Sequence, residues 1–182
     1  MKHHRPYPHR GFTLLELLSI MVIISALAAM TIPMATRLTA GARAAHCMTH
    51  LRAIGSALQG YLADNNNILP TLVMARESSS ENEPAIDTVL LPYAGSPTVF
   101  QCIADNKNLY QTTGSSYLWN SLVNGQNTAA MNFMTIANDG SRIPIVSDKE
   151  NFHQYQAVQV NILYADGHAS KDIQFVTNTA GQ

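Results

Sequence analysis

A run of twenty residues without a formal charge, residues 17–36, constrains this chain more than any other feature. Leucine, isoleucine, methionine, valine and alanine dominate the run, and about twenty apolar residues are what a helix needs to cross a bilayer. The run therefore predicts a transmembrane helix over about residues 14–36. Glu16 lies at its start, where an acid is costly in lipid and implies a charged partner or an interfacial position.

The residues before the apolar run form a basic leader. Residues 1–10 contain three basic residues, three histidines and no acid, and Gly11 and Phe12 follow them. This leader, with glutamate as the fifth residue after the glycine, resembles the class III signal of type IV pilins and type II secretion pseudopilins. In that family a membrane-embedded prepilin peptidase cuts after the glycine and methylates the new N-terminal phenylalanine. The resemblance implies processing between Gly11 and Phe12, a role in assembly for Glu16, and a helix-kinking role for Pro33.

Two other readings of the N-terminus stay open. An ordinary secretory signal peptide also has a basic start and an apolar centre, and the alanines within residues 26–29 imitate its small-x-small cleavage site. A plain signal anchor is the second alternative. Neither gives a reason for an acid at Glu16.

The flanking charges do not decide the membrane orientation, because three basic residues lie on each side of the span. The resemblance implies a single-pass protein of the inner (cytoplasmic) membrane, with a cytoplasmic N-terminus and a periplasmic head. After assembly the protein would lie in a periplasmic filament or at the cell surface. The implied partners are prepilin peptidase, other pilin or pseudopilin subunits, an inner-membrane assembly platform with its ATPase, and membrane lipid.

The helix is expected to continue well beyond the span. Apolar residues recur at three- and four-residue steps, which predicts an amphipathic upper half; they are Leu38, Ala42, Ala45, Met48, Leu51, Ile54, Leu58 and Leu62. The polar run at residues 64–67 and Pro70 predict its end. The expected division is a leader at 1–11, a long helix at 12–63 and a globular head at 64–182.

The head carries short strand signals. Strands are predicted at residues 98–103, 116–120, 143–147, 158–165 and 169–175, with one or two helical turns at 86–93, a solvated loop at 76–84 and a long loop at 120–138. Asp166 and Gly167 predict a hairpin between the last two strands, and Tyr117 and Trp119 are expected to face the core. The fold class is α+β: a long N-terminal helix, transmembrane below and amphipathic above, packed against a small antiparallel sheet, as in pilins.

Three head segments resemble the pseudopilin-like proteins of planctomycetes and verrucomicrobia. Residues 42–70 are similar to their upper helix with its cysteine, 99–106 to their Phe-x-Cys-Pro-x-Asp segment, and 161–170 to their Asn-x-Leu-x-Ala-Asp-Gly-His segment. That family has a C-terminal H-x9-DG motif. Here Gln156 stands at the histidine position and His153 lies three residues too early, so no role is carried over to the histidine or to the Asp-Gly segment.

The chain has two cysteines, Cys47 and Cys102. The implied topology places both outside the cytoplasm, where disulfides persist. Neither has a Cys-x-x-Cys or zinc-site spacing. A disulfide between the helix and the head's central strand region is therefore predicted, with two unpaired core thiols as the alternative.

No catalytic grouping stands out, and the chain is predicted not to be an enzyme. Candidate members of a catalytic triad are Ser147 and Asp148 with His153, or Asp166 with His168. No Gly-x-Ser-x-Gly motif, the usual setting of a nucleophilic serine, supports either grouping. The histidines of the leader, His3, His4 and His9, are read as part of its cationic character.

No cofactor is expected, with calcium as the exception to consider. Some major pseudopilins hold calcium in this region, and Asp139, Asp148 and Asp166 offer oxygen ligands. An EF-hand spacing is absent, and turn formation by Asp-Gly is the competing interpretation.

The residues and the resemblance together predict a pilin or pseudopilin subunit that polymerises into a type II secretion pseudopilus or a type IV pilus-like filament. A membrane-anchored periplasmic domain with a binding or enzymatic role is the alternative. Residues 64–182 hold five basic and eleven acidic residues, a net charge of −6, which argues against nucleic acid as a partner. Arg37, Arg43 and Arg52 have no acid nearby in sequence and are expected to face the acidic heads of neighbouring subunits. Contact with lipid headgroups or with the acids of their own head is the alternative.

Overall fold

The computed structural model describes residues 11–153 and 159–171, and the chain forms two compact units, Met1–Thr39 and Ala40–Gln182. Several predictions fall on residues outside those ranges. They concern the leader up to Arg10, the position of Gln156, and the outer ends of the two last predicted strands.

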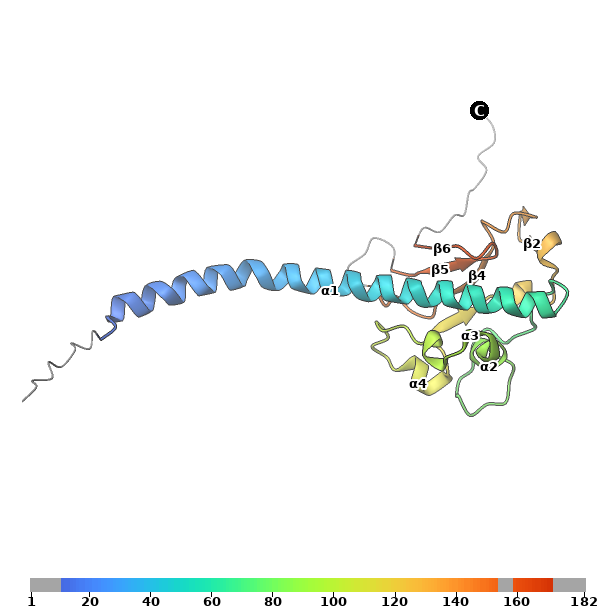
Figure 1. Ribbon diagram of the computed structural model, residues 1–182, viewed down its shortest axis with the longest axis horizontal. Coiled ribbons are helices and arrows are strands. Elements are labelled where there is room, and N and C mark those ends of the chain that lie inside the picture. The colour runs from blue at the N-terminus through green and yellow to red at the C-terminus, as the bar shows by residue number, and fades with distance from the viewer. Residues whose placement is uncertain (1–10, 154–158, 172–182) are drawn as a thin grey trace, which may run out of the picture. The chain divides into compact units, whose positions relative to one another are not determined.

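Helix α1 runs from Leu14 to Asp64 (Figure 1). It is the one helix among the described residues that is long and apolar enough to cross a membrane. Its apolar side chains before Thr39 are largely exposed, as expected of a segment whose natural solvent is lipid. Pro33 lies inside α1, where its ring removes the backbone donor that would bond the Ala29 carbonyl.

The end of α1 is set by asparagine. After Asp64, Asn66 and Asn67 adopt positive φ angles of 55° and 59°, a left-handed conformation that asparagine tolerates better than most residues. The Asn67 N–H donates to the Leu62 carbonyl (2.9 Å) and satisfies one of the open groups at the helix end. The predicted stop in this polar run is confirmed.

The upper part of α1 buries one face against the head. Met48, Leu51, Ile54, Leu58 and Leu62 are buried, as their spacing predicted. The lower end of the predicted face is wrong, because Leu38, Ala42 and Ala45 are exposed. Ala44 and Cys47 are fully buried in their place.

A four-stranded antiparallel sheet forms the centre of the head, in the order β1-β4-β5-β6. Its strands are β1 (Tyr117–Trp119), β4 (Pro144–Asp148), β5 (Ile162–Tyr164) and β6 (Ala169–Ser170). Tyr117 pairs with Asp148 and Trp119 with Val146, and the β4–β5 register shifts between Pro144 and Val146. The predicted α+β class, with a long N-terminal helix and a small antiparallel sheet, is confirmed.

The Asp166–Gly167 hairpin between β5 and β6 forms as predicted. Gly167 has φ +90°, a conformation that disfavours side chains. The Gly167 N–H donates to the Tyr164 carbonyl (2.9 Å), and the His168 N–H donates to Asp166 Oδ1 (3.0 Å). The His168 ring stacks on Tyr164 with centroids 4.6 Å apart, so the segment acts as a closed turn.

Two local predictions in the head are wrong. Residues 97–100 form the 3₁₀ helix η1 (Pro97–Phe100) where a strand was expected, because Pro97 fixes φ and the Ser96 hydroxyl accepts from the Thr98 N–H. The predicted long loop contains the hairpin β2 (Asn132–Phe133) and β3 (Ile136–Ala137). It also contains η2 (Ser121–Val123) and η3 (Thr128–Ala130).

Short helices complete the head: α2 (Ile86–Val89) and α3 (Leu91–Ala94), where one or two turns were predicted, and α4 (Leu109–Thr113), which was not predicted. The loop at 76–84 is anchored by a buried side chain, where full solvation was expected. The Arg76 guanidinium pairs with Asp87 and donates to the Ser79 and Glu81 carbonyls (3.2 and 3.1 Å). Burial raises the pKa of Asp87, and the Arg76 charge opposes that rise.

The two aromatic residues of β1 lie in the core as predicted. Tyr117 and Trp119 are each 1% exposed. The Trp119 indole N–H donates to Asn124 Oδ1 (2.7 Å), which gives its one polar atom a partner. Tyr117 reaches the helix, where its hydroxyl donates to the Cys47 carbonyl (3.4 Å).

Candidate functional site

The first candidate site is the start of α1. Gly11 and Phe12 precede the helix, and Phe12 is 75% exposed. Thr13 caps the helix, since its side-chain oxygen accepts from the Glu16 N–H (3.2 Å) and its carbonyl accepts from the Leu17 N–H (3.2 Å). Glu16 lies in the first turn, where the helix dipole favours a negative charge.

Sequence reasoning missed Thr13. The signal was present, because Thr-x-x-Glu ahead of an apolar run is the pattern of a capping box. Thr13 and Glu16 thus act locally to begin the helix, whatever further role the Glu16 carboxylate has in assembly.

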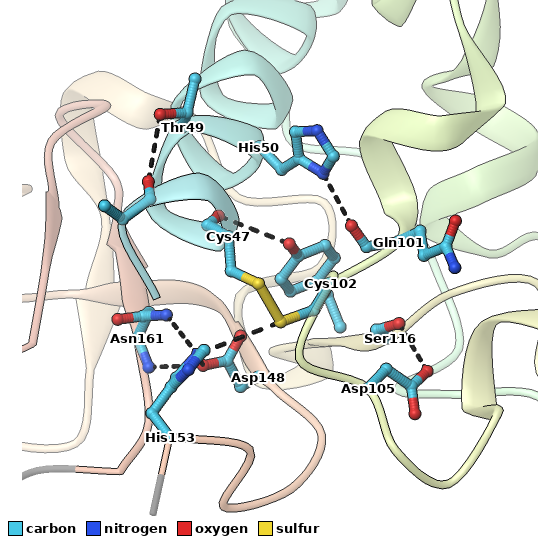
Figure 2. The surroundings of a disulfide bond; sticks show 12 residues. Cys47, Thr49, His50, Gln101, Cys102, Asp105, Ser116, Asp148, His153 and Asn161 are labelled. Atoms are coloured by element: carbon cyan, nitrogen blue, oxygen red, sulfur yellow. Dashed lines mark hydrogen bonds and ion pairs between the residues drawn. A yellow bond between two sulfur atoms is a disulfide. The ribbon is translucent and has the colours of Figure 1, made fainter. Parts of the chain in front are cut away.

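The second candidate site is a buried cluster around a disulfide in the head (Figure 2). Cys47 of α1 and Cys102 are bonded, with Cα atoms 4.9 Å apart, and both are fully buried. Cys102 follows η1, so the bond ties α1 to a loop, where a strand region was expected. Asp105, three residues on, caps the next segment. Its carboxylate accepts from the Tyr110 N–H (2.9 Å) and the Ser116 hydroxyl (2.8 Å).

Burial alone would raise the pKa of Asp105, but hydrogen bonds from the Tyr110 and Leu109 N–H groups and the Ser116 hydroxyl outweigh it and lower the pKa. The carboxylate form is therefore the one that the fold stabilises. Asp105 stands at the aspartate position of segment 99–106, which resembles the Phe-x-Cys-Pro-x-Asp segment. Its hydrogen bonds to the following residues explain structurally why an acid is present there.

A polar trio fills the other side of the disulfide. His153 Nε2 lies 3.1 Å from Asp148 Oδ2, 2.7 Å from Asn161 Nδ2 and 4.0 Å from Cys102 Sγ (Figure 2). All three polar residues are buried. Asp148 Oδ2 also accepts from the Asn161 backbone N–H (2.7 Å). Burial raises the pKa of Asp148, and the hydrogen bond with His153 partly offsets the rise.

The trio does not form a hydrolytic triad. Ser147 neighbours Asp148 on β4, and successive strand residues point to opposite faces. Ser147 instead lines an apolar hollow of about 220 Å³ beside Trp119. The Asp166–His168 pair (2.6 Å) is half exposed and serves the β5–β6 turn. The cluster around His153 is therefore suited to holding elements together.

The predicted calcium ligands are not brought to one point. Asp139 Oδ1 accepts from the Ser141 hydroxyl (2.6 Å) and N–H (3.2 Å), Asp166 caps its own hairpin, and Asp148 is buried against His153. Within residues 11–153 and 159–171, the one group of three or more side chains with metal-ligand atoms gathered together is Cys47, Cys102 and His153, within 4.8 Å. The disulfide leaves that group no thiolate for a metal.

The N-terminal geometry agrees with the one comparison that found a match. Residues 8–32 match the family model described as the prokaryotic N-terminal methylation motif. This motif is the prepilin-type signal of type IV pilins and pseudopilins. It indicates a pilin-like or pseudopilin-like substrate of prepilin peptidase, carried on a single-pass apolar anchor, and it favours a structural protein over an enzyme.

No curated protein and no solved structure matched the chain. The family model covers residues 8–32 only, which end within the first half of α1. The finer resemblance of the head to the planctomycete and verrucomicrobial proteins, with its H-x9-DG motif, therefore stays a prediction.

Proposed function

We propose that this protein is a structural subunit that is cut after Gly11, methylated on Phe12, and polymerised through α1 into a type II secretion pseudopilus or a type IV pilus-like filament. One observation carries the proposal. The methylation motif at residues 8–32 ends in an apolar helix whose first turn holds a single acid, Glu16. The α+β head on the same helix supports it, since this is the pilin-like architecture.

Glu16 has a direct role in this mechanism. Cleavage frees the amine of Phe12, which carries a positive charge close to the bilayer face. The Glu16 carboxylate of a neighbouring subunit supplies the opposite charge, and a pair stripped of water attracts far more strongly than one in bulk water. Leaving either charge alone in lipid is costly. The pair therefore fixes the axial register between subunits as they leave the membrane.

Pro33 contributes flexibility to the same process. The missing N–H at Pro33 leaves α1 one hydrogen bond short within its apolar part. Local bending there lets the helices adjust while they pack.

The proposal includes an orientation and a set of partners. The leader faces the cytoplasm, the head lies in the periplasm, and the partners are prepilin peptidase, other subunits, an assembly platform and its ATPase. A periplasmic head suits the Cys47–Cys102 disulfide, because that compartment is oxidising. The proposed function does not require calcium in the head.

The test is the intact mass of the protein extracted from membranes of cells with and without prepilin peptidase. The expected product with the peptidase begins at Phe12 and carries one added methyl group. Without the peptidase, the mass corresponds to the whole chain. Retention of residues 1–11 in cells with an active peptidase would overturn the proposal and favour an anchored periplasmic domain instead.

A further inference from the structure

Two histidines one turn apart on α1 form a pair that no part of the proposed function uses. The rings of His46 and His50 are in contact, with centroids 4.5 Å apart and planes at 68°. Residues four apart on a helix lie on the same face, so the pair is held together by the backbone of α1 itself. His46 is exposed and His50 is half buried.

A hydrogen bond fixes which nitrogen of His50 is free. Its Nδ1 lies 2.6 Å from the backbone carbonyl oxygen of Gln101 (Figure 2). A carbonyl only accepts, so Nδ1 carries the proton and donates. In neutral His50, Nε2 then holds the lone pair, and Figure 2 shows this second nitrogen on the side of the ring away from Gln101.

This arrangement is the one that metal-binding histidines have. A ligating imidazole almost always donates its other N–H to a carbonyl or carboxylate, which fixes the tautomer and the ring orientation. His46 has no hydrogen-bond partner on its ring within the part of the chain that the structure describes, so its nitrogens are open to a ligand.

The surroundings select the class of metal. Residues 40–63 of α1 contain no acid, while Arg43 lies one turn before His46. Hard cations such as calcium and magnesium need oxygen ligands, and a site without a carboxylate beside an arginine does not attract them. Imidazole nitrogen suits zinc, nickel and copper instead.

We propose that His46 and His50 bind one late first-row divalent metal ion, such as Zn²⁺ or Ni²⁺, through the Nε2 atom of His50 and one ring nitrogen of His46. Water fills the other coordination positions. The site is separate from Gly11, Phe12 and Glu16, and it does not rest on the proposed function.

The test is calorimetric titration of the full-length chain in detergent with ZnCl₂ and, separately, with NiCl₂. The leader histidines would compete, so the background carries His3→Ala, His4→Ala and His9→Ala, which leaves four of the seven histidines. One ion per chain is expected. His46→Ala and His50→Ala should each weaken binding by at least about tenfold, since even losing an outer-shell partner costs about 10- to 100-fold.

Two controls make the result specific. His168→Ala, on the β5–β6 turn, should bind as the background does. The double change Ala45→His with His46→Ala keeps the number of histidines but spaces them five apart, and it should lose binding because the rings leave the common face. Unchanged affinity in His46→Ala, or full affinity in the five-apart variant, would overturn the proposal. The circular dichroism spectrum of each variant confirms that α1 remains folded.

Discussion

His153 Nε2 and Asp148 Oδ2 lie 3.1 Å apart in the interior of the head, with side chains 1% and 0% exposed. The two residues come from different segments, Asp148 from β4 and His153 from the chain that leaves it. Their contact stands directly against the disulfide, because the same nitrogen is 4.0 Å from Cys102 Sγ. The pair therefore couples the sheet to the cross-link.

His153→Ala should destabilise the head, because it leaves the Asp148 carboxyl buried with one partner fewer. Breaking a buried pair from one side typically costs about 3–5 kcal/mol. Unfolding of the full chain in detergent, followed by the fluorescence of its one tryptophan, Trp119, measures the change. The double variant, His153→Ala with Asp148→Asn, should lose less free energy of unfolding than the two single variants lose in sum. His46→Ala, at an exposed position of α1, serves as control, and strict additivity would contradict the coupling.

The stability lost in His153→Ala should depend on pH. Burial raises the pKa of Asp148, and His153 partly offsets the rise. Because the pKa of Asp148 is raised in the folded state, the contribution of this carboxyl to stability is fullest below its pKa in the unfolded chain, about 3.9. That contribution is lost as pH rises through the pKa of the folded state. Without His153 the offset disappears. The stability gap between wild type and His153→Ala should therefore widen as pH rises from about 4, and a gap that narrows over that range would show the opposite linkage.

Asp105→Ala should lower stability at neutral pH by about 1–2 kcal/mol, because the Tyr110 N–H and the Ser116 hydroxyl lose their acceptor. The pKa of Asp105 is lowered in the folded chain. Its contribution is therefore present above the unfolded value, about 3.9, and is lost as pH falls through the folded value. Urea titrations at pH 7 and near pH 3 check this. The exposed neighbour Asn106→Ala should have little effect at either pH, and an equal penalty for Asp105→Ala at both would refute the role of the carboxylate.

Non-reducing mass spectrometry of protein taken from membranes should find Cys47 linked to Cys102. The bond spans a sequence separation of 55, for which the chain-entropy model gives about 4 kcal/mol. The variant with Cys47→Ser and Cys102→Ser should unfold at a correspondingly lower urea concentration. Two alkylatable thiols in protein that was never reduced would rule out the disulfide.

Glu16→Ala should leave membrane insertion and processing at Gly11 intact while impairing filament assembly, because the counter-charge is needed only when subunits meet. The mass of the processed protein and the yield of sheared filaments separate the two steps. Glu83→Ala, on an exposed head loop, is the matched loss of one negative charge and should assemble normally. Normal yield from Glu16→Ala would count against the register mechanism.

Arg43→Glu with Arg52→Glu should weaken assembly, most at low salt. None of the ion pairs within residues 11–153 and 159–171 involves Arg37, Arg43 or Arg52, and all three residues are exposed. Contacts between exposed charges set register and association rate more than affinity, and they are screened over about 8–10 Å. Lysine substitutions at head acids should partly restore assembly. Normal assembly of the reversed variant at both low and high salt would exclude a role of these arginines in subunit packing.

Patterns with a simple physical origin were predictable. The methylation signal, the apolar span and the helix end at Asp64 are local, and so is the Asp166–Gly167 turn, because each depends on a few adjacent residues. Trp119 and Tyr117 were placed correctly because strand alternation sends both to one face. These features need no knowledge of the rest of the chain.

The cluster around His153 depends on tertiary packing and was not predictable in the same way. Asn161 carries no local signal for its contact with His153, and the sequence suggested Ser147 as the partner instead. The predicted face of α1 began too early, at Leu38, whereas its burial begins near Ala44. A lipid-facing helix also carries apolar residues at three- and four-residue steps, so the same pattern occurs where the helix packs against nothing in the head. The amino-acid composition of α1 therefore could not show at which residue the helix begins to pack against the head.

The Cys47–Cys102 bond also has a mechanical consequence. When a chain is stretched from its ends, a cross-link removes the enclosed residues from the length that can be drawn out. With a separation of 55 residues and about 3.4 Å per extended residue, reduction should add about 190 Å to the extension at rupture. In the oxidised head, tension along α1 passes from Cys47 to Cys102 through the disulfide, so the residues between them, which include the end of α1, carry none of it.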